Sequence, residues 1–394
     1  MKITISGWYG HFNAGDDAIL QVFIEQAQAR LPCEIVVLSE LPHNIPPEPG
    51  VSSQFHLPLT LNFSAKAILD GSYWRHLRNL WNTDLFVLGG GGLLRDNTTW
   101  RNLFRLLDEI FICKLLGKKV MLYGIGVGPF KTRVGKSLIG MAVRLCDLIT
   151  VRDANSSRLL QEVGVSAERI HVVADPAFLL QPETPPDAEL RALLADGSMI
   201  GVFPTWHSFY GTGDMTQAKR IAATLDAITE QTGTRFLAVP MQVSHDGMDD
   251  VKFSYAIKAA MRHPDALVVY ESRLSAAQLK WVTGQTKMNI TVRLHAMIFS
   301  LGAQCPVVAT NYEPKVAAVF SRLNQPEYLI ELDADYESKH TAAVLHCLRE
   351  RDAYSQAITA ALPSYQQAAV VTFDLMSALM TEQRPSLAKV LPTK

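Results

Sequence analysis

The sequence has few cysteines and lacks both a long apolar run and an excess of charge of either sign. Its five cysteines are scattered along 394 residues and form no CxxC pair: Cys33, Cys113, Cys146, Cys305 and Cys347. This odd, dispersed set gives neither a disulfide framework nor a zinc site, and it favours buried thiols in a reducing compartment. No apolar run reaches the roughly 18 residues of a membrane span, and the apolar stretch that begins at Ile3 is too short for a signal peptide. We therefore expect a cytoplasmic protein without a membrane-spanning helix.

The charge balance excludes several classes of partner. Lys and Arg number 37 against 38 Asp and Glu, which gives a formal net charge of −1. This balance, without a basic stripe, argues against nucleic-acid binding but leaves room for a local basic pocket. The sequence has no HExxH motif and no grouped Asp/His constellation, so we expect no metal ion. The length and the 48% share of hydrophobic residues indicate two or three globular domains.

Short β-branched runs alternate with longer amphipathic stretches, which is typical of βαβ units around a parallel sheet. In the first half the pattern predicts strands at Ile3–Ser6, Glu34–Leu38, Asp84–Leu88, Lys119–Tyr123, Leu148–Arg152 and Ile170–Val173. It predicts helices at Asp17–Leu31, Trp100–Leu116, Val134–Cys146 and Ala154–Val163. Residues 41–80 contain several prolines and no clear periodicity, so we interpret them as an irregular insertion.

A second run of strands and helices follows a proline-rich, acidic stretch between Gln181 and Gly197, which we interpret as an interdomain linker. The predicted strands are Met199–Phe203, Arg235–Val239, Ala266–Tyr270, Met288–Val292 and Pro306–Thr310. The predicted helices are Thr216–Gln231, Asp249–Arg262, Ser275–Thr283, Leu294–Leu301, Pro314–Leu323, Lys339–Leu362 and Ser364–Met380. The sequence thus predicts two doubly wound, Rossmann-like α/β domains that face each other across a cleft, residues 1–182 and 196–362, with a C-terminal helix and tail over 363–394.

Glycine-rich loops follow three predicted strands of the first half. The loop after the first strand brings Asn13, Asp16 and Asp17 to a helix N-terminus. Carboxylates there would repel a phosphate, so we expect these residues to bind sugar hydroxyls, with a plain helix cap as the alternative. The run Gly89–Gly92 costs backbone entropy and must serve the close approach of a ligand, which we favour, or of a neighbouring loop. The third loop, Gly124–Pro129, fits a tight strand-to-helix connection equally well.

The candidate chemistry lies in the second half, where Arg293 and His295 stand at the transition from a strand to a helix. Lys315 occupies the first turn after the next strand, so we expect the three side chains to converge from adjacent loops. Arg152 ends a strand of the first half and adds a fourth cation, with a salt bridge to Asp153 as the structural alternative. Arginine and lysine bind phosphate and carboxylate groups, and histidine suits acid/base chemistry near neutral pH. The pattern predicts an anion-binding active site.

The motifs occur in a fixed order within residues 1–325: Asn13–Leu20, Gly89–Gly92, Tyr123–Pro129, Val151–Asp153, Arg293–His295 and Asn311–Lys315. This ordered set resembles the polysaccharide pyruvyl transferase family, and specifically its CsaB-like bacterial members. The Asn-x-Gly-Asp start and the Arg-Leu-His triplet weigh most in the resemblance. The sequence departs from the family pattern in residues 41–80 and in its helical tail, so the acceptor is the least transferable inference.

The resemblance implies a fold similar to GT-B glycosyltransferases, with the first domain on the acceptor side and the second on the donor side. It implies transfer of pyruvate from phosphoenolpyruvate, a co-substrate, to two hydroxyls of a saccharide, giving a cyclic ketal and phosphate in cell-surface polysaccharide biosynthesis without a cofactor. His295 and Lys315 would be catalytic, with His295 as general acid/base. The donor would be bound by Arg152, Arg293, Leu294, Lys315, Gly89, Gly90 and Gly91, and the acceptor by Asn13, Asp16 and Asp17.

Two other interpretations stay open. A GT-B-type glycosyltransferase would use the same architecture and basic pocket to bind the diphosphate of a nucleotide sugar. A non-enzymatic carbohydrate- or anion-binding protein would retain the scaffold but would not need His295 among cations. Attachment of the saccharide acceptor to a lipid carrier is also open, as is contact of the mildly basic tail, Leu387–Lys394, with the inner face of the cell membrane.

Overall fold

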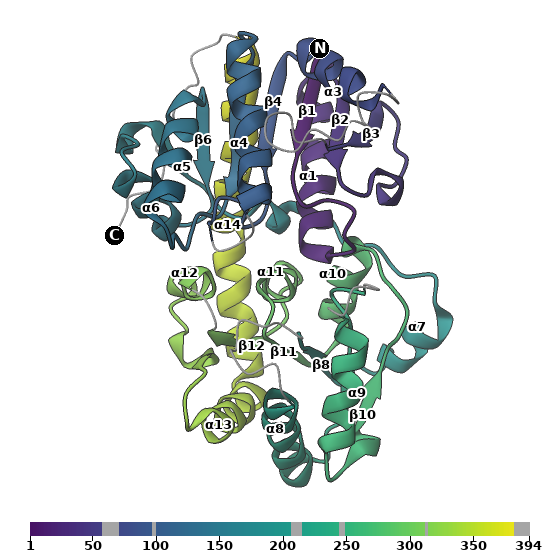
Figure 1. Cartoon of the computed structure of the whole chain (residues 1–394). Coiled ribbons are helices and arrows are strands. Elements are labelled where there is room, and N and C mark those ends of the chain that lie inside the picture. The colour runs from purple at the N-terminus through teal and green to yellow at the C-terminus, as the bar shows by residue number, and fades with distance from the viewer. Residues whose placement is uncertain (57–70, 97–99, 206–214, 244–248, 312–313, 382–394) are drawn as a thin grey trace. The chain divides into compact units, whose positions relative to one another are not determined.

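The structure is a computed structural model that describes residues 1–56, 71–96, 100–205, 215–243, 249–311 and 314–381. The chain divides into two compact units (Figure 1). Unit 1 consists of Met1–His11, Ile19–Pro176 and Tyr365–Lys394, and unit 2 consists of Phe12–Ala18 and Ala177–Ser364. Each unit therefore combines stretches that are distant in the sequence.

Unit 1 contains a parallel sheet whose described strands have the order β3-β2-β1-β4-β5-β6-β7. The strands are β1 (Lys2–Ser6), β2 (Glu34–Ser39), β3 (Val51–Phe55), β4 (Leu85–Gly89), β5 (Lys119–Ile125), β6 (Leu148–Val151) and β7 (Ile170–Val172). The helices between them are α1 (Ala14–Arg30), α3 (Ser72–Trp81), α4 (Trp100–Leu115), α5 (Arg133–Leu145) and α6 (Ala154–Glu162). The strand order reverses between β1 and β4, so the carboxyl ends of these two strands form the topological switch point of the sheet.

Unit 2 contains a second parallel sheet, with the described strands in the order β10-β9-β8-β11-β12-β13. The strands are β8 (Ile200–Phe203), β9 (Phe236–Ala238), β10 (Leu267–Val269), β11 (Met288–Thr291), β12 (Val307–Asn311) and β13 (Leu329–Glu331). The helices are α7 (Ala188–Leu194), α8 (Thr216–Thr232), α9 (Asp250–Ala260), α10 (Ala276–Gln285), α11 (Leu294–Gly302), α12 (Pro314–Leu323) and α13 (Tyr336–Arg349). Here the order reverses between β8 and β11, so the loop after β11 lies at the switch point.

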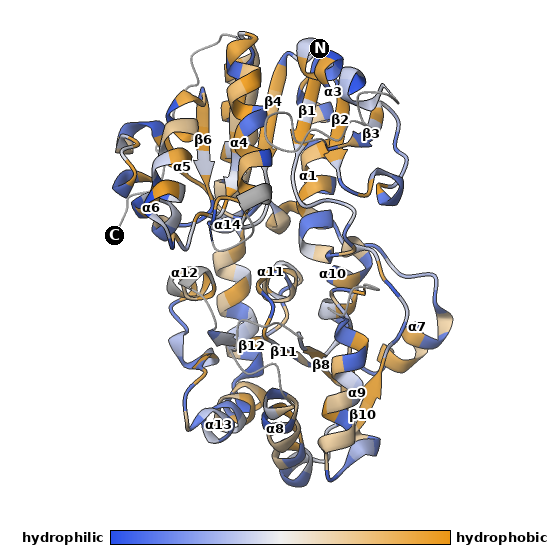
Figure 2. Ribbon diagram, in the orientation of Figure 1, coloured by the Kyte–Doolittle hydropathy of each residue, from blue (hydrophilic) through white to orange (hydrophobic). Residues whose placement is uncertain are grey.

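Burial on both faces explains why the central strands read as continuous apolar runs. Every residue of β4, β6, β8 and β11 is buried, as expected of parallel strands covered by helices on both sides. Figure 2 shows the same hydrophobic colouring along β1, β2 and β4. The register aligns the carboxyl ends of neighbouring strands, since Thr291 of β11 pairs with Phe203 of β8 and Ala309 of β12. Side chains that follow these strands therefore gather at one edge of the sheet.

Most predicted elements are confirmed, and the ends of the strands differ by one or two residues from those predicted. The interpretation of residues 41–80 as an irregular insertion is wrong for its described parts, which form β3 and α3. Strand β3 was hard to predict because it is a short, partly exposed edge strand. Helix α3 was hard to predict because its exposed side contains tryptophans as well as arginines. The predicted linker contains a helix, α7, whose first turn is capped by Asp187, and β13 was not predicted.

The C-terminal helices divide at a different residue from the predicted one. Pro363 was expected to separate two helices, but α14 (Arg351–Thr381) runs through Pro363 and the break lies at Glu350. The boundary between the two units falls just after this proline, between Ser364 and Tyr365. The units thus differ from the predicted domains 1–182 and 196–362 in three places, because α14 continues into unit 1, Phe12–Ala18 belongs to unit 2, and the second stretch of unit 2 already begins at Ala177. No helix among the described residues is long and apolar enough to cross a membrane.

Candidate active site

The loop after β11 places two of the predicted site residues. Arg293 is the N-cap of α11, and the Thr291 hydroxyl accepts a hydrogen bond from the Arg293 N–H at 2.8 Å and donates one to the Arg293 carbonyl at 3.0 Å. A guanidinium has no acceptor atom, so the Arg293 side chain cannot cap the helix, and it donates to other partners instead. His295 follows in the first turn of the same helix.

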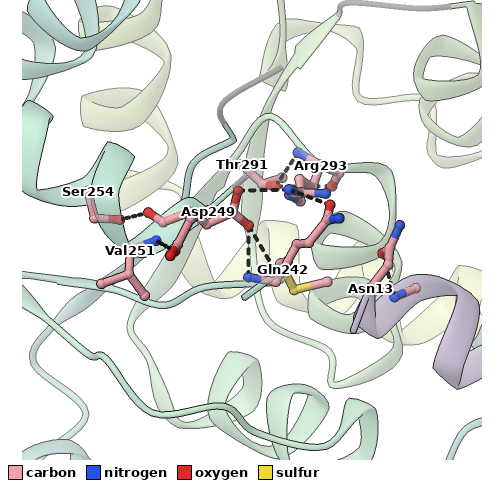
Figure 3. Close-up of polar contacts among 10 residues, drawn as sticks. Asn13, Gln242, Asp249, Val251, Ser254, Thr291 and Arg293 are labelled. Carbon is pink, nitrogen blue, oxygen red and sulfur yellow. Dashed lines mark hydrogen bonds and ion pairs between the residues drawn. The ribbon is translucent and has the colours of Figure 1, made fainter. Parts of the chain in front are cut away.

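The Arg293 guanidinium is held by a buried carboxylate. Its Nη2 donates to Oδ1 of Asp250 at 2.7 Å and to Oε1 of Gln242 at 3.4 Å (Figure 3). The other oxygen of Asp250 accepts the backbone N–H groups of Met241 and Gln242 at 3.1 and 2.9 Å. Burial raises the pKa of Asp250, and the Arg293 charge opposes that rise. A carboxylate that accepts these three hydrogen bonds is matched to a fixed arginine, and it sets the guanidinium in one orientation.

Arg293 also has a buried N–H group that no protein group accepts among the described residues. The Nε of Arg293 is buried and has no hydrogen-bond partner among the described residues. Because buried polar groups are nearly always paired, a leftover guanidinium N–H is a candidate contact for an anionic ligand.

His295 lies directly against the backbone of Gly15. A Cβ atom on Gly15 would overlap the imidazole ring, at 2.6 Å from Cε1 and closer still to Nδ1. Gly15 is the second residue of α1, and its N–H donates to Oδ1 of Asn13 at 3.1 Å. The glycine of the Asn-x-Gly-Asp motif is therefore required by the ring that packs on it.

A short antiparallel pairing fixes this motif in unit 2. Asn13 pairs with Gln242, and the N–H of Ala14 donates to the carbonyl of Met241 at 3.0 Å. The stretch Phe12–Ala18 is thereby joined to the loop whose backbone also binds Asp250. Three stretches distant in sequence thus surround the Arg293 and His295 pair.

The two predicted acceptor-binding acids follow on α1. Asp16 is buried, with 7% of its surface exposed. Asp17 forms an ion pair with Arg273 at 3.4 Å, and the Arg273 guanidinium lies 3.9 Å from the centre of the Phe12 ring. The structure thus brings Asn13, Asp16 and Asp17 into the same unit as Arg293 and His295, whereas the sequence placed them in the first domain.

Arg152 lies in unit 1, directly after β6, and its partner differs from the predicted one. Its Nη1 donates to Oδ2 of Asp175 at 2.7 Å, and both side chains are buried. Asp153 instead caps α6, since its side chain accepts the N–H and the hydroxyl of Ser156 at 2.7 and 2.9 Å. The structural alternative, a salt bridge to Asp153, is therefore wrong in its partner, because that carboxylate is occupied at the helix end and Arg152 pairs with Asp175.

The glycine run after β4 is closely packed. A Cβ atom on Gly89 would lie 2.7 Å from the carbonyl oxygen of Tyr123, and one on Gly90 would lie 2.6 Å from Ile19. Gly90 and Gly91 also have positive φ angles, 80° and 73°. Gly92 has open space around it. Neighbouring side chains thus already require two of these glycines, and donor binding by Gly89, Gly90 and Gly91 stays a prediction.

Lys315 is at the start of α12, as expected, but its side chain lies outside what the structure describes. Leu294 is buried in the first turn of α11. Within the described ranges, no group of three His, Cys, Asp or Glu side chains is arranged to hold a metal ion.

Comparison with known proteins decides the family. A model of the family described as polysaccharide pyruvyl transferase matches residues 13–314, which include the Gly15, Asp250, Arg293 and His295 cluster. The chain belongs to the polysaccharide pyruvyl transferase family.

One curated relative of this pyruvyl transferase family chain is the amylovoran biosynthesis protein AmsJ of Erwinia amylovora, 22% identical over 267 residues. The match covers 64% of this chain and 64% of AmsJ. Among solved structures, Anabaena Alr3699/HepE in complex with UDP has a TM-score of 0.63 at 13% identity, over 97% of this chain and 100% of that one. The S. aureus MnaA–UDP structure has a TM-score of 0.63 at 12% identity, over 100% and 99% of the two chains. These similarities show the expected fold, two Rossmann-like domains of GT-B type.

Sequence reasoning missed Asp250, Gln242 and the reason for Gly15. The pair Asp249–Asp250 carries one weak signal, because one acid is enough to cap α9 and the second is then unexplained. No spacing rule connects Asp250 to Arg293, which lies 43 residues later. Gly15 was visible as a glycine in a helix start, but the ring that needs it comes from a distant helix.

Proposed function

We propose that this chain transfers the pyruvyl group of phosphoenolpyruvate to two hydroxyls of a saccharide, forming a cyclic ketal and releasing phosphate. The observation that supports this most directly is the Arg293 and His295 pair at the switch point of unit 2. Arg293 is fixed by Asp250 with its buried Nε unpaired, and His295 is fixed against Gly15. The loop after β11 thus supplies an oriented guanidinium for anion binding and an oriented imidazole for proton transfer.

The chemistry requires both groups. Phosphoenolpyruvate has a phosphate and a carboxylate, which arginine binds through paired N–H groups. A proton is added to the methylene carbon while a sugar hydroxyl forms a C–O bond to the enol carbon and loses its own proton. A second hydroxyl then forms the other C–O bond and loses its proton, while the C–O bond to the phosphate group breaks and phosphate leaves with that electron pair and the proton. We assign proton transfer to His295, an effect worth about 10²–10⁴ in rate.

The other assignments extend this proposal. Lys315 would assist catalysis and bind the donor, and Arg152, Leu294 and the Gly89–Gly91 run would complete the donor contacts. Asn13, Asp16 and Asp17 would bind acceptor hydroxyls. The pairing of Asp17 with Arg273 means that a sugar hydroxyl would share or displace an ion pair that is partly open to solvent. The position of Asn13 beside Gln242 supports its assignment near Arg293.

The test combines substrate and variant. The purified chain is incubated with phosphoenolpyruvate and a panel of saccharides, and phosphate release and ketal-linked pyruvate are measured by colorimetry and mass spectrometry. His295→Ala should lower turnover by at least about 100-fold without changing thermal unfolding. His263→Ala, which removes an exposed histidine of the same unit, is the matched control.

Two outcomes would overturn the proposal. A glycosidic bond formed from a nucleotide sugar, with no reaction of phosphoenolpyruvate, would indicate a glycosyltransferase. Unchanged phosphate release in His295→Ala would remove the imidazole from the mechanism.

A further inference from the structure

Unit 1 exposes aromatic side chains at one corner, formed by β3 and α3. Among its described residues, the strongly exposed aromatic side chains are Phe55, Trp74 and Trp81, with 57%, 60% and 65% of their surface exposed. Phe55 ends β3, the edge strand, and both tryptophans lie on α3, which packs against β3. A group of large apolar side chains exposed close together on a surface is typical of an interaction site.

The exposed side of α3 combines tryptophan with arginine. Trp74, Arg78 and Trp81 have the spacing i, i+4 and i+7, which places them on one side of the helix over about two turns. Arg75 is also exposed beside them. We call these four residues the α3 face. The opposite side anchors the helix, since His76 and Leu80 are buried and Tyr73 and Leu77 pack on the core of unit 1.

The α3 face is positively charged and its charges are available. Helix α3 contains no acidic residue. In the part of the chain that the structure describes, the guanidinium groups of Arg75 and Arg78 form no ion pair or hydrogen bond. Other exposed arginines are neutralised, for example Arg158 by Glu162 and Arg262 by Glu230. In a chain with a formal net charge of −1, this is a local concentration of unpaired positive charge.

We propose that the α3 face docks on the surface of an anionic lipid bilayer. Tryptophan rings prefer the headgroup level of a membrane, where one part of the ring is apolar and the N–H is hydrated. Arginines beside them pair with lipid phosphates and are attracted by the negative surface potential. Two turns of helix suffice for reversible, peripheral binding but not for insertion.

None of the four residues of the α3 face belongs to the candidate active site, and the predicted basic tail lies outside the described residues. Docking would give the enzyme access to acceptors held on a lipid carrier, and it rests on the exposed residues of α3 rather than on the pyruvyl transfer proposal.

The full chain is tested by flotation with vesicles of phosphatidylcholine alone and of phosphatidylcholine mixed with phosphatidylglycerol. We expect binding at least about tenfold stronger to the anionic vesicles, weakening as salt increases. Trp74→Ser combined with Trp81→Ser should reduce binding to both vesicle types. Arg75→Gln combined with Arg78→Gln should remove the preference for anionic lipid. Arg158→Gln combined with Arg262→Gln changes the net charge equally at exposed sites elsewhere and should bind like the unmodified chain.

Three outcomes would overturn this proposal. The first is equal binding of the unmodified chain to both vesicle types, or no binding. The second is unchanged binding of both α3 variants. The third is a chain that is dimeric in solution, ignores vesicles and becomes monomeric in the tryptophan variant, which would make the α3 face an interface between copies. Phosphate release with a water-soluble acceptor should be the same in the α3 variants and the unmodified chain, so failure of docking and failure of pyruvyl transfer are distinguishable.

Discussion

Different contacts organise the loops at the carboxyl ends of the strands in the two sheets. In unit 1, two tyrosine rings of the same unit contact the end of β4. The Tyr9 hydroxyl donates to the Gly89 carbonyl, and Tyr123 of β5 packs against Gly89. In unit 2, the loop after β11 carries a guanidinium held by buried Asp250 and an imidazole held by Gly15. The glycine run of unit 1 is closed by packing, whereas the loop after β11 in unit 2 is organised by charge.

The difference teaches how to interpret glycine in such loops. Gly89 ends β4 and Gly15 lies in the first turn of α1, and in the sequence both belong to glycine-containing motifs that follow predicted strands. Gly89 is explained by a neighbouring tyrosine of the same sheet, and Gly15 by a histidine from a separate segment that belongs to the candidate site. A glycine shows that something approaches the backbone closely, and only the structure shows what approaches.

Removal of Asp250 should give the largest effect on stability. Asp250→Ala leaves Arg293 and two backbone N–H groups without their buried acceptor, so we expect the free energy of unfolding to fall by about 3–5 kcal/mol. Asp249→Ala is the matched control, because that carboxylate caps α9 and its loss costs about 1 kcal/mol. Urea unfolding of both variants measures the difference. Equal losses would mean that charge does not organise the edge of unit 2.

Acid should destabilise unit 2 through a histidine remote from the site. Burial lowers the pKa of His340 to about 4 from an ordinary value near 6.5. Between these values the unfolded chain binds a proton that the folded chain does not, so stability falls as the pH drops from about 6.5 to 4, by about 3 kcal/mol. His340→Leu should remove this part of the pH dependence. His263→Leu, at an exposed histidine, should leave it unchanged, and a His340→Leu variant as acid-sensitive as the unmodified chain would contradict the prediction.

Gly15→Ala should separate catalysis from stability. The new methyl group displaces the His295 ring, and a displacement of about 1 Å at a reacting group costs on the order of 100-fold in rate. The ring can rotate away, so the loss of stability should be small. Initial rates of phosphate release report the first effect and thermal unfolding the second. Gly284→Ala, at an exposed position of α10 where the nearest atom is Ala303 Cβ at 3.2 Å, should change neither by much. A Gly15→Ala variant with the unmodified rate would show that the ring position is unimportant.

Gly89→Ala should show the opposite pattern, with the smallest expected effect. Its methyl group meets the Tyr123 backbone, which cannot rotate away, so we expect stability to fall by about 1–3 kcal/mol. Unfolding in urea measures this loss. If stability were unchanged and the KM for phosphoenolpyruvate rose instead, the glycine run would serve the ligand and the contrast between the two edges would disappear.

The sequence was sufficient for the parallel sheets because buried parallel strands leave continuous apolar runs between amphipathic helices. It was insufficient for β3, which is short and at an edge, and for the helix through Pro363, where tertiary packing overrides a residue that usually ends helices. The Arg293 and His295 pair was visible because strand ends at a switch point are where ligands bind.

The partners of that pair were not visible from the sequence. Asp250 and Gly15 reach Arg293 and His295 from 43 and 280 residues away along the chain, and no periodicity spans such distances. The same holds for Asp175, which replaced Asp153 as the partner of Arg152 because Asp153 was needed at a helix end.

The division of α1 between the two units has a consequence for truncated and chimeric forms of this protein. Phe12–Ala18 are grouped with residues 177–364, while the rest of α1 is grouped with the other unit. A fragment cut at the boundary near residue 177 would carry His295 but lose the glycine beneath its ring and the strand partner of Gln242. Exchange of C-terminal halves between relatives would therefore transfer His295 without the glycine against which its ring packs. The exchange would also have to include the stretch that corresponds to Phe12–Ala18.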